Sequence, residues 1–186
     1  MTVGFAVCGS HCTFSQIFPA MEELAKHHKV IPIFSQAAAS TDTRFGSARE
    51  HLQRAEAICG CAPILTVAQA EPIGPKKLLD ALVIAPCTGN TLAKLAHSIA
   101  DSPVTMAAKS HLRNGRPILI GVSTNDALAG AAENIGKLMG RRHYYFIPFG
   151  QDDPIQKPTS MVADFSKLLP ALEAALGGRQ LQPILL

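Results

Sequence analysis

Charged and aromatic residues are scarce in this 186-residue sequence. Only 17% of the residues are charged, 5% are aromatic, and tryptophan is absent. The net charge of +3 is small and the basic residues do not cluster, so nucleic-acid binding gains no support. No run of eighteen apolar residues occurs, and no transmembrane helix is expected. The first apolar run has no basic segment before it, so we predict no signal peptide and a cytoplasmic protein.

Cysteine is present, but not in a pattern that supports a disulfide framework. The odd number of thiols in a reducing compartment argues against paired cysteines. Neither close pair shows a zinc-ligand spacing with a partnering pair of histidines, so we predict small buried thiols and no metal site. The five residues are Cys8, Cys12, Cys59, Cys61 and Cys87.

The apolar content of 47% suits one domain with a substantial core. We expect this domain to span residues 1–176, followed by a tail at 177–186. The low charge also indicates a homo-oligomer or a chain bound to a partner.

The stretch from Leu79 to Asp101 organises the rest of the chain. Residues 81–85 form an unbroken apolar run that predicts a buried strand, which we expect Pro86 to end because proline has no N–H to donate. A small polar loop follows, and residues 91–100 show the spacing of an amphipathic helix. A strand, a small-residue loop and a helix start are a usual place for an α/β protein to hold a phosphate or the edge of a ring.

Strand and helix patterns alternate along the whole chain. This alternation predicts an α/β fold: a single-domain, doubly wound parallel sheet in a three-layer α/β/α arrangement, Rossmann-like or flavodoxin-like. Polar loops are predicted at 36–45 and 150–158. The predicted strands are 2–8, 30–35, 63–67, 81–85, 117–122 and 144–148, and the predicted helices are 13–28 (capped by Thr13 with Gln16), 46–58, 91–100, 103–114, 127–139 and 160–176.

Four of the loops that follow strands carry hydroxyl, amide or charged groups. Each one alone is read more simply as a helix N-cap. The carboxyl ends of parallel strands meet at one sheet edge, however, so four such loops together favour a shared ligand site. The first loop lacks a complete G-x-G-x-x-G and fits a single phosphate better than a dinucleotide. The groups concerned are Gly9, Ser10 and His11; Ser35 and Arg44; Thr88 and Asn90; and Ser123 and Asp126.

Individual side chains in this set have alternative interpretations. His11 is either a site residue or a turn histidine, His97 is expected at the surface, and the histidines expected to be solvated are His27, His28, His51 and His143. Lys109 and Arg113 lie four residues apart on one helix face, which is either a solvated face or a contact for a dicarboxylate. No spacing pairs a nucleophile with a base, so a hydrolase is not supported.

Residues 80–101 resemble the A-P-x-(T/S)-(A/G)-N-T-(L/I)-A-K-x-A motif of the flavoproteins that include flavin-dependent cysteine decarboxylases. The resemblance implies FMN as the candidate cofactor, with Asn90 beside the flavin and Gly9 and Ser10 at its phosphate. Ser35 would be a further phosphate contact, and Thr88 and Ser123 complete the predicted cofactor-binding set. The decarboxylases carry a histidine shortly before this motif, but residues 71–75 contain none, so cysteine decarboxylation is not expected.

A second set of blocks covers nearly the whole chain and resembles the family of dipicolinate synthase B subunits. They include G-S-H-C-T (9–13), T-D-T-R-F-G (41–46), D-S-P-V-x-M-A-A-K (101–109), S-T-N-D-A-L (123–128), F-G-Q-D (149–152) and K-P-x-S-M-V (157–162). This resemblance implies one component of an oxidoreductase that acts in the mother cell of a sporulating bacterium. It works with a partner, the A subunit, that carries NAD(P), in the oxidation of dihydrodipicolinate or 4-hydroxy-tetrahydrodipicolinate to dipicolinate.

On this interpretation cationic side chains hold the two substrate carboxylates, and His11 or Asp126 moves a proton. The predicted substrate-binding cations are Arg44, Lys109, Arg113 and Lys157. Two alternatives stay open: a stand-alone FMN enzyme of the decarboxylase or prenyltransferase type, and a non-catalytic component that stabilises the A subunit.

Overall fold

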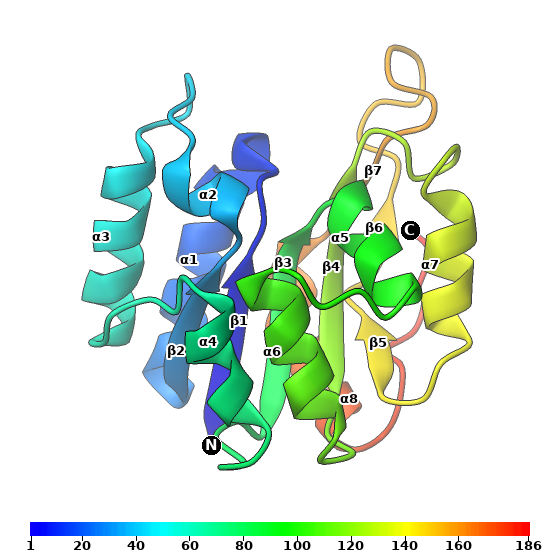
Figure 1. Ribbon diagram of the computed structural model, residues 1–186. Helices are drawn as coiled ribbons and strands as arrows, with labels where there is room; N and C mark the ends of the chain where they lie inside the picture. Colours follow the sequence, from blue (N-terminus) through cyan, green and yellow to red (C-terminus); the bar gives the residue numbers. More distant parts are fainter.

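A seven-stranded, mostly parallel sheet forms the centre of the computed structural model, which describes residues 1–186 (Figure 1). The strand order is β2-β1-β3-β4-β7-β6, and β5 also pairs with β4. The parallel part, β2-β1-β3-β4-β5, has the order of flavodoxin-like sheets, and the predicted fold class is confirmed. The strands are β1 (Thr2–Val7), β2 (Lys29–Phe34), β3 (Ala81–Cys87), β4 (Ile118–Thr124), β5 (Tyr144–Phe146), β6 (Phe149–Gly150) and β7 (Met161–Ala163).

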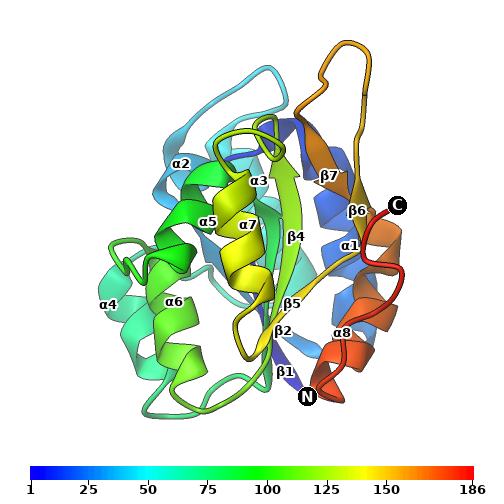
Figure 2. The same ribbon diagram turned by 90° about the vertical axis from the view of Figure 1, so that its right-hand side faces the viewer.

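Helices cover both faces of this sheet. In Figure 2, α5, α6 and α7 lie on one face, and α1 and α8 lie on the other. None of the helices has the length and apolar character needed to cross a bilayer. The helices are α1 (Phe14–His27), α2 (Gln36–Ser40), α3 (Ala48–Cys59), α4 (Val67–Ala70), α5 (Gly89–Ala96), α6 (Pro103–Leu112), α7 (Ala132–Met139) and α8 (Leu168–Leu176).

Capping explains two of the differences from the predicted elements. The predicted strand at 63–67 is wrong: Ile64 makes one isolated bridge to Ile33, and a capping box between Thr66 and Gln69 starts α4 instead. The predicted box between Thr13 and Gln16 does not form, because the Thr13 hydroxyl donates to the carbonyl of Ser10.

Three boundaries also differ from prediction. Residues 36–40, predicted as loop, form α2, whose first turn is capped by Ser35. The strand at 81 continues through Pro86 to Cys87, with a register shift between Ile84 and Cys87 where the proline donates no hydrogen bond. The predicted helix 127–139 begins only at Ala132.

The predicted last helix, 160–176, is wrong in its first part. Met161 to Ala163 form β7, whose alternating burial has the period of a strand and whose pairing with β4 and β6 is antiparallel. Helix α8 begins at Leu168, so Pro170 falls in its first turn, where no intrahelical hydrogen bond is lost. The chain after α8 returns to the sheet edge, where Leu185 makes an isolated bridge to Phe149.

His111, on α6, is fully buried, and its shifted pKa predicts a pH dependence of the stability of the fold. Its Nε2 lies 3.1 Å from the carbonyl oxygen of Pro117, and its Nδ1 has no partner. Burial lowers the pKa of His111 from its ordinary value of 6.5 to about 4. The unfolded chain therefore binds a proton between these pH values that the folded chain excludes.

We expect the free energy of unfolding to be highest above pH 6.5 and to fall as the pH drops towards about 4. At about 1.4 kcal/mol per pKa unit, the loss from this one group is roughly 3 kcal/mol at pH 4. Urea unfolding of the wild type and of His111→Gln at a series of pH values measures it. An identical pH dependence in the two proteins would contradict the assignment to His111.

Candidate functional site

A polar cavity of about 800 Å³ opens at the carboxyl edge of the sheet, the upper edge in Figure 1. Its walls come from the loops after β1, β3 and β4, from the segment between α2 and α3, and from the segment between β6 and β7. The structure thus brings together most of the side chains that the sequence placed at this edge. The predicted site residues in its lining are Gly9, Ser10, His11, Thr88, Asn90, Ser123, Asp126 and Lys157.

A second lobe of about 680 Å³ adjoins the polar cavity and shares Gly9, Thr88 and Asn90 with it. Ser35 lies in the wall of this lobe and also caps α2, since its hydroxyl accepts from the N–H of Ala38. Thr88 likewise caps α5 while it lines both lobes. The N-cap interpretation and the ligand interpretation of these two residues are therefore compatible.

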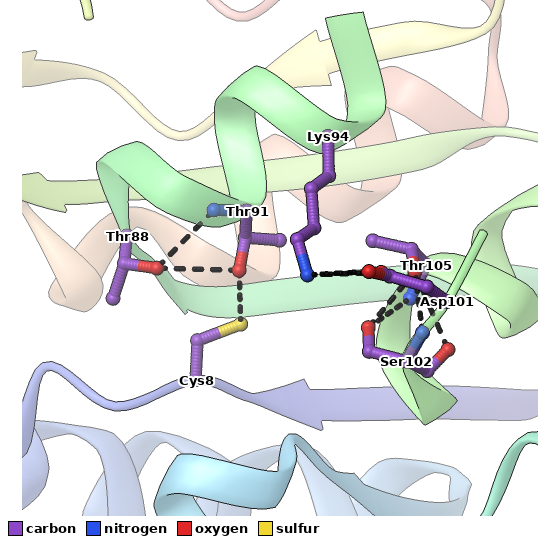
Figure 3. A network of polar contacts seen from close by, with 7 residues as sticks. All are labelled: Cys8, Thr88, Thr91, Lys94, Asp101, Ser102 and Thr105. Carbon is purple, nitrogen blue, oxygen red and sulfur yellow. Dashed lines mark hydrogen bonds and ion pairs between the residues drawn. The ribbon is translucent and has the colours of Figure 1, made fainter. Parts of the chain in front are cut away.

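Helices α5 and α6 begin at the second lobe, and a polar network fixes their first turns (Figure 3). The Thr91 hydroxyl donates to Cys8 Sγ at 3.3 Å, which ties α5 to the end of β1. Lys94 Nζ lies 2.9 Å from the Asp101 carboxylate, so this cation is neutralised by the protein itself. The lobe consequently offers neutral hydroxyl and N–H donors rather than free positive charge.

The loops after β1 and β4 are joined directly. The hydroxyls of Ser10 and Ser123 lie 2.8 Å apart. The Thr124 hydroxyl donates to Asp126, whose carboxylate lies against the first residue of α5: a Cβ on Gly89 would come within 2.7 Å of Asp126 Oδ1. Glycine at 89 is thus required for this close approach, and the positive end of the α5 dipole favours the carboxylate there.

His11 is held against Phe14, with 4.9 Å between the ring centroids. Its Nε2 is buried and has no hydrogen-bond partner in the protein. Buried polar atoms without partners are rare in folded proteins, and at a cavity wall they mark a place for a ligand or a transferred proton.

The prediction of a solvated His51 is wrong. Only 8% of this residue is exposed, and its ring stacks on Phe18 at 5.5 Å. Burial is the main cause that lowers the pKa of His51, and the neighbouring His11 adds to it. His51 therefore supports the wall behind His11 as a neutral aromatic group.

The predicted cations are distributed over different places. Lys157 lines the polar cavity, where its Nζ lies 3.2 Å from Asp152. Arg44 is exposed and stacks over the ring of Phe45 at 4.8 Å; Phe45 lines the cavity, whereas Arg44 does not. The structure does not bring Lys109 and Arg113 to this site, because they line a separate cavity between α5, α6 and β5.

Several lining residues were missed by sequence reasoning: Cys12, Phe45, Asp152 and Ser160. Asp152 and Ser160 lie in the blocks at 149–152 and 157–162. Only the resemblance to the B-subunit family drew attention to these two blocks. Their position at the cavity depends on β7 pairing with β4, which no local pattern indicates.

Two of the thiols are inert by burial. Burial raises the pKa of Cys8 to about 11 and the pKa of Cys87 well above its ordinary value. Both stay protonated near neutral pH and act as small core residues, as predicted. The prediction of a buried thiol is wrong for Cys12, which is exposed at the cavity, and Cys59 and Cys61 are only half-buried.

Known proteins share both the sequence and the architecture of this chain. The profile of the Flavoprotein family matches residues 1–157. The dipicolinate synthase B subunit of Bacillus subtilis (strain 168) is 48% identical over 184 residues, which cover 98% of this chain and 92% of that protein. The crystal structure of the dipicolinate synthase B subunit from Bacillus halodurans superposes with a TM-score of 0.91 at 46% identity, over 100% of this chain and 95% of that one.

A more distant structure shares only the fold. Burkholderia xenovorans DmrB in complex with FMN has a TM-score of 0.68 at 18% identity, over 95% of each chain. The chain belongs to the Flavoprotein family, in which it is similar to the B subunits of dipicolinate synthase.

Proposed function

We propose that this chain is the B subunit of a dipicolinate synthase and acts with a separate A subunit in the NAD(P)-dependent formation of dipicolinate. The observation that carries the proposal is the 48% identity to a dipicolinate synthase B subunit over 98% of the chain. The polar cavity adds support, because the blocks at 9–13, 123–128 and 157–162 each contribute to its lining.

The reaction would remove two electrons and two hydrogens from the ring of dihydrodipicolinate. One hydrogen leaves as hydride to NAD(P)⁺ on the A subunit, and the other leaves as a proton. With 4-hydroxy-tetrahydrodipicolinate as substrate, loss of water precedes this step. A base must accept the proton as the ring becomes aromatic.

Within this chain, we assign the base to His11 or Asp126, which both line the polar cavity. Ser10 and Ser123 would donate hydroxyl hydrogen bonds to a substrate carboxylate, and Lys157 would supply positive charge on exchanging its contact with Asp152. Arg44, adjacent to the cavity-lining Phe45, would approach the substrate only from the rim.

The same residues fit a phosphate-bearing cofactor of the FMN class. The fit rests on the neutral donors of the two lobes and on the unpartnered Nε2 of His11. Gly9, Ser10 and Ser35 would hold the phosphate, and Thr88, Asn90 and Ser123 would line the ring and its chain. When bound, FMN supplies electron-transfer chemistry.

This fit favours one alternative, a stand-alone FMN enzyme. A flavin absorbance band that co-purifies with the chain, together with turnover in the absence of the A subunit, would replace our first proposal with this one. Our proposal also places the protein in the cytoplasm of a sporulating mother cell and in a homo-oligomer.

Reconstitution tests the proposal directly. The A subunit alone, this chain alone and an equimolar mixture are supplied with substrate and NAD(P)⁺, and reduced nicotinamide and dipicolinate are both measured. We expect product only from the mixture. Full activity from the A subunit alone would instead identify this chain as a non-catalytic partner.

A further inference from the structure

A cavity of about 440 Å³ lies between the end of α5, helix α6 and the turn that leads into β5. It shares no lining residue with the polar cavity or its second lobe. Four basic residues and no acidic residue line it. We call it the cationic cavity, after Lys109, Arg113, Arg141 and Arg142.

Three of these four cations have no partner in the protein. Lys109 lies on α6, Arg113 directly follows the last residue of that helix, and Arg142 comes from the segment before β5. None of the three makes an ion pair or a side-chain hydrogen bond. Arg141 is different, because its guanidinium donates to the carbonyls of Leu95 and Ala96 and so closes the end of α5.

The floor of the cationic cavity is apolar. Leu95, Ala108 and Leu112 contribute to it, and Tyr144 is 8% exposed beside them. Burial raises the pKa of Tyr144, so its hydroxyl stays neutral and can donate a hydrogen bond. A volume of about 440 Å³ lies within the usual range of small-molecule sites.

This combination selects the chemistry of the ligand. Unpaired cations around a concave surface attract an anion, and arginine pairs well with carboxylate. A small inorganic ion would leave the apolar floor uncovered, whereas a ring covers it. Free cations come from two separate segments, α6 with its C-terminal end and the turn before β5, so each segment can pair with a different carboxylate of one ring.

We propose that the cationic cavity binds a small cyclic dicarboxylate, at a site separate from the polar cavity. Electrostatics distinguish the two sites. The lysines beside the polar cavity and its second lobe, Lys157 and Lys94, are each paired with an aspartate, while three of the four cations here are free. Binding at this cavity does not require the proposed function, since it is measured without the A subunit.

Calorimetric titration of the whole chain with benzene-1,3-dicarboxylate tests the proposal. A hydrogen bond to a charged group is lost in Arg113→Ala and in Arg142→Ala, so each variant should weaken binding by about tenfold or more. Raising the salt concentration should weaken binding further. Inorganic phosphate should bind more weakly than the ring dicarboxylate.

The matched control is Arg49→Ala, which removes an exposed arginine on α3 that has no side-chain partner. Thermal melting of each variant verifies that the fold is retained. Because the proposed substrate site contains Ser10, the titrations are repeated in Ser10→Ala, where the losses caused by Arg113→Ala and Arg142→Ala should persist. The proposal is overturned by an absence of binding, or by equal affinity in the wild type and both arginine variants.

Discussion

In the proposed reaction with the A subunit, replacing His11 with alanine is expected to lower the rate of dipicolinate formation by about 10²–10⁴-fold, the usual contribution of a positioned acid or base. His11 is the one histidine in the lining of the polar cavity, and its buried Nε2 has no partner in the folded chain. No protein hydrogen bond has to break before this ring accepts a proton from a ligand.

Parallel kinetics of Asp126→Asn decide between the two proposed bases. If His11 accepts the proton, His11→Ala should lose kcat and regain part of it on addition of imidazole, while Asp126→Asn should lose less. His97→Ala is the matched control, since His97 is exposed at the end of α5 and lies outside both lobes. Unchanged kcat in His11→Ala would remove His11 from the mechanism.

Hydrophobic patterning predicted the architecture because the central strands are buried on both faces. The run at 81–85 has no polar residue, and β3 is fully buried between β1 and β4. Such runs are typical of parallel strands, and their carboxyl ends must then share one edge. For this reason the loops at Gly9, Asn90 and Ser123 could be placed together from the sequence.

Site residues were harder to predict where their position depends on pairing between strands that are far apart in the sequence. Asp152 and Ser160 reach the polar cavity only because β7 pairs antiparallel with β4.

Lys109 and Arg113 do not lie at the polar cavity, and the reason is a different one. Helix α6 begins at the second lobe with Pro103, so these cations lie about 9–15 Å further along the helix axis, away from the carboxyl edge. Periodicity identified their common face but not its distance from the site.

Truncating Leu82 to alanine is expected to lower the free energy of unfolding by about 2–5 kcal/mol, because it leaves a cavity in the middle of the sheet. Leu82 is fully buried on β3 and reaches across β1, where a Cβ on Gly4 would lie 2.9 Å from its Cδ1. Domains of this kind have a total stability of about 5–15 kcal/mol, so the loss is a large fraction of it. Urea unfolding measures the change, and Leu78→Ala is the matched control because Leu78 is 39% exposed.

The same contact predicts a coupling between the two strands. A methyl group added at Gly4 would press on Leu79 and Leu82, at 2.6 and 2.9 Å from their Cδ1 atoms. Gly4→Ala alone should therefore destabilise the chain by about 1–3 kcal/mol through overpacking. In Leu82→Ala part of that space is free, so the double variant should be more stable than the sum of the single losses implies. Strict additivity would mean that the methyl group is accommodated against Leu79 alone, and that the size of Leu82 does not set the requirement for glycine in β1.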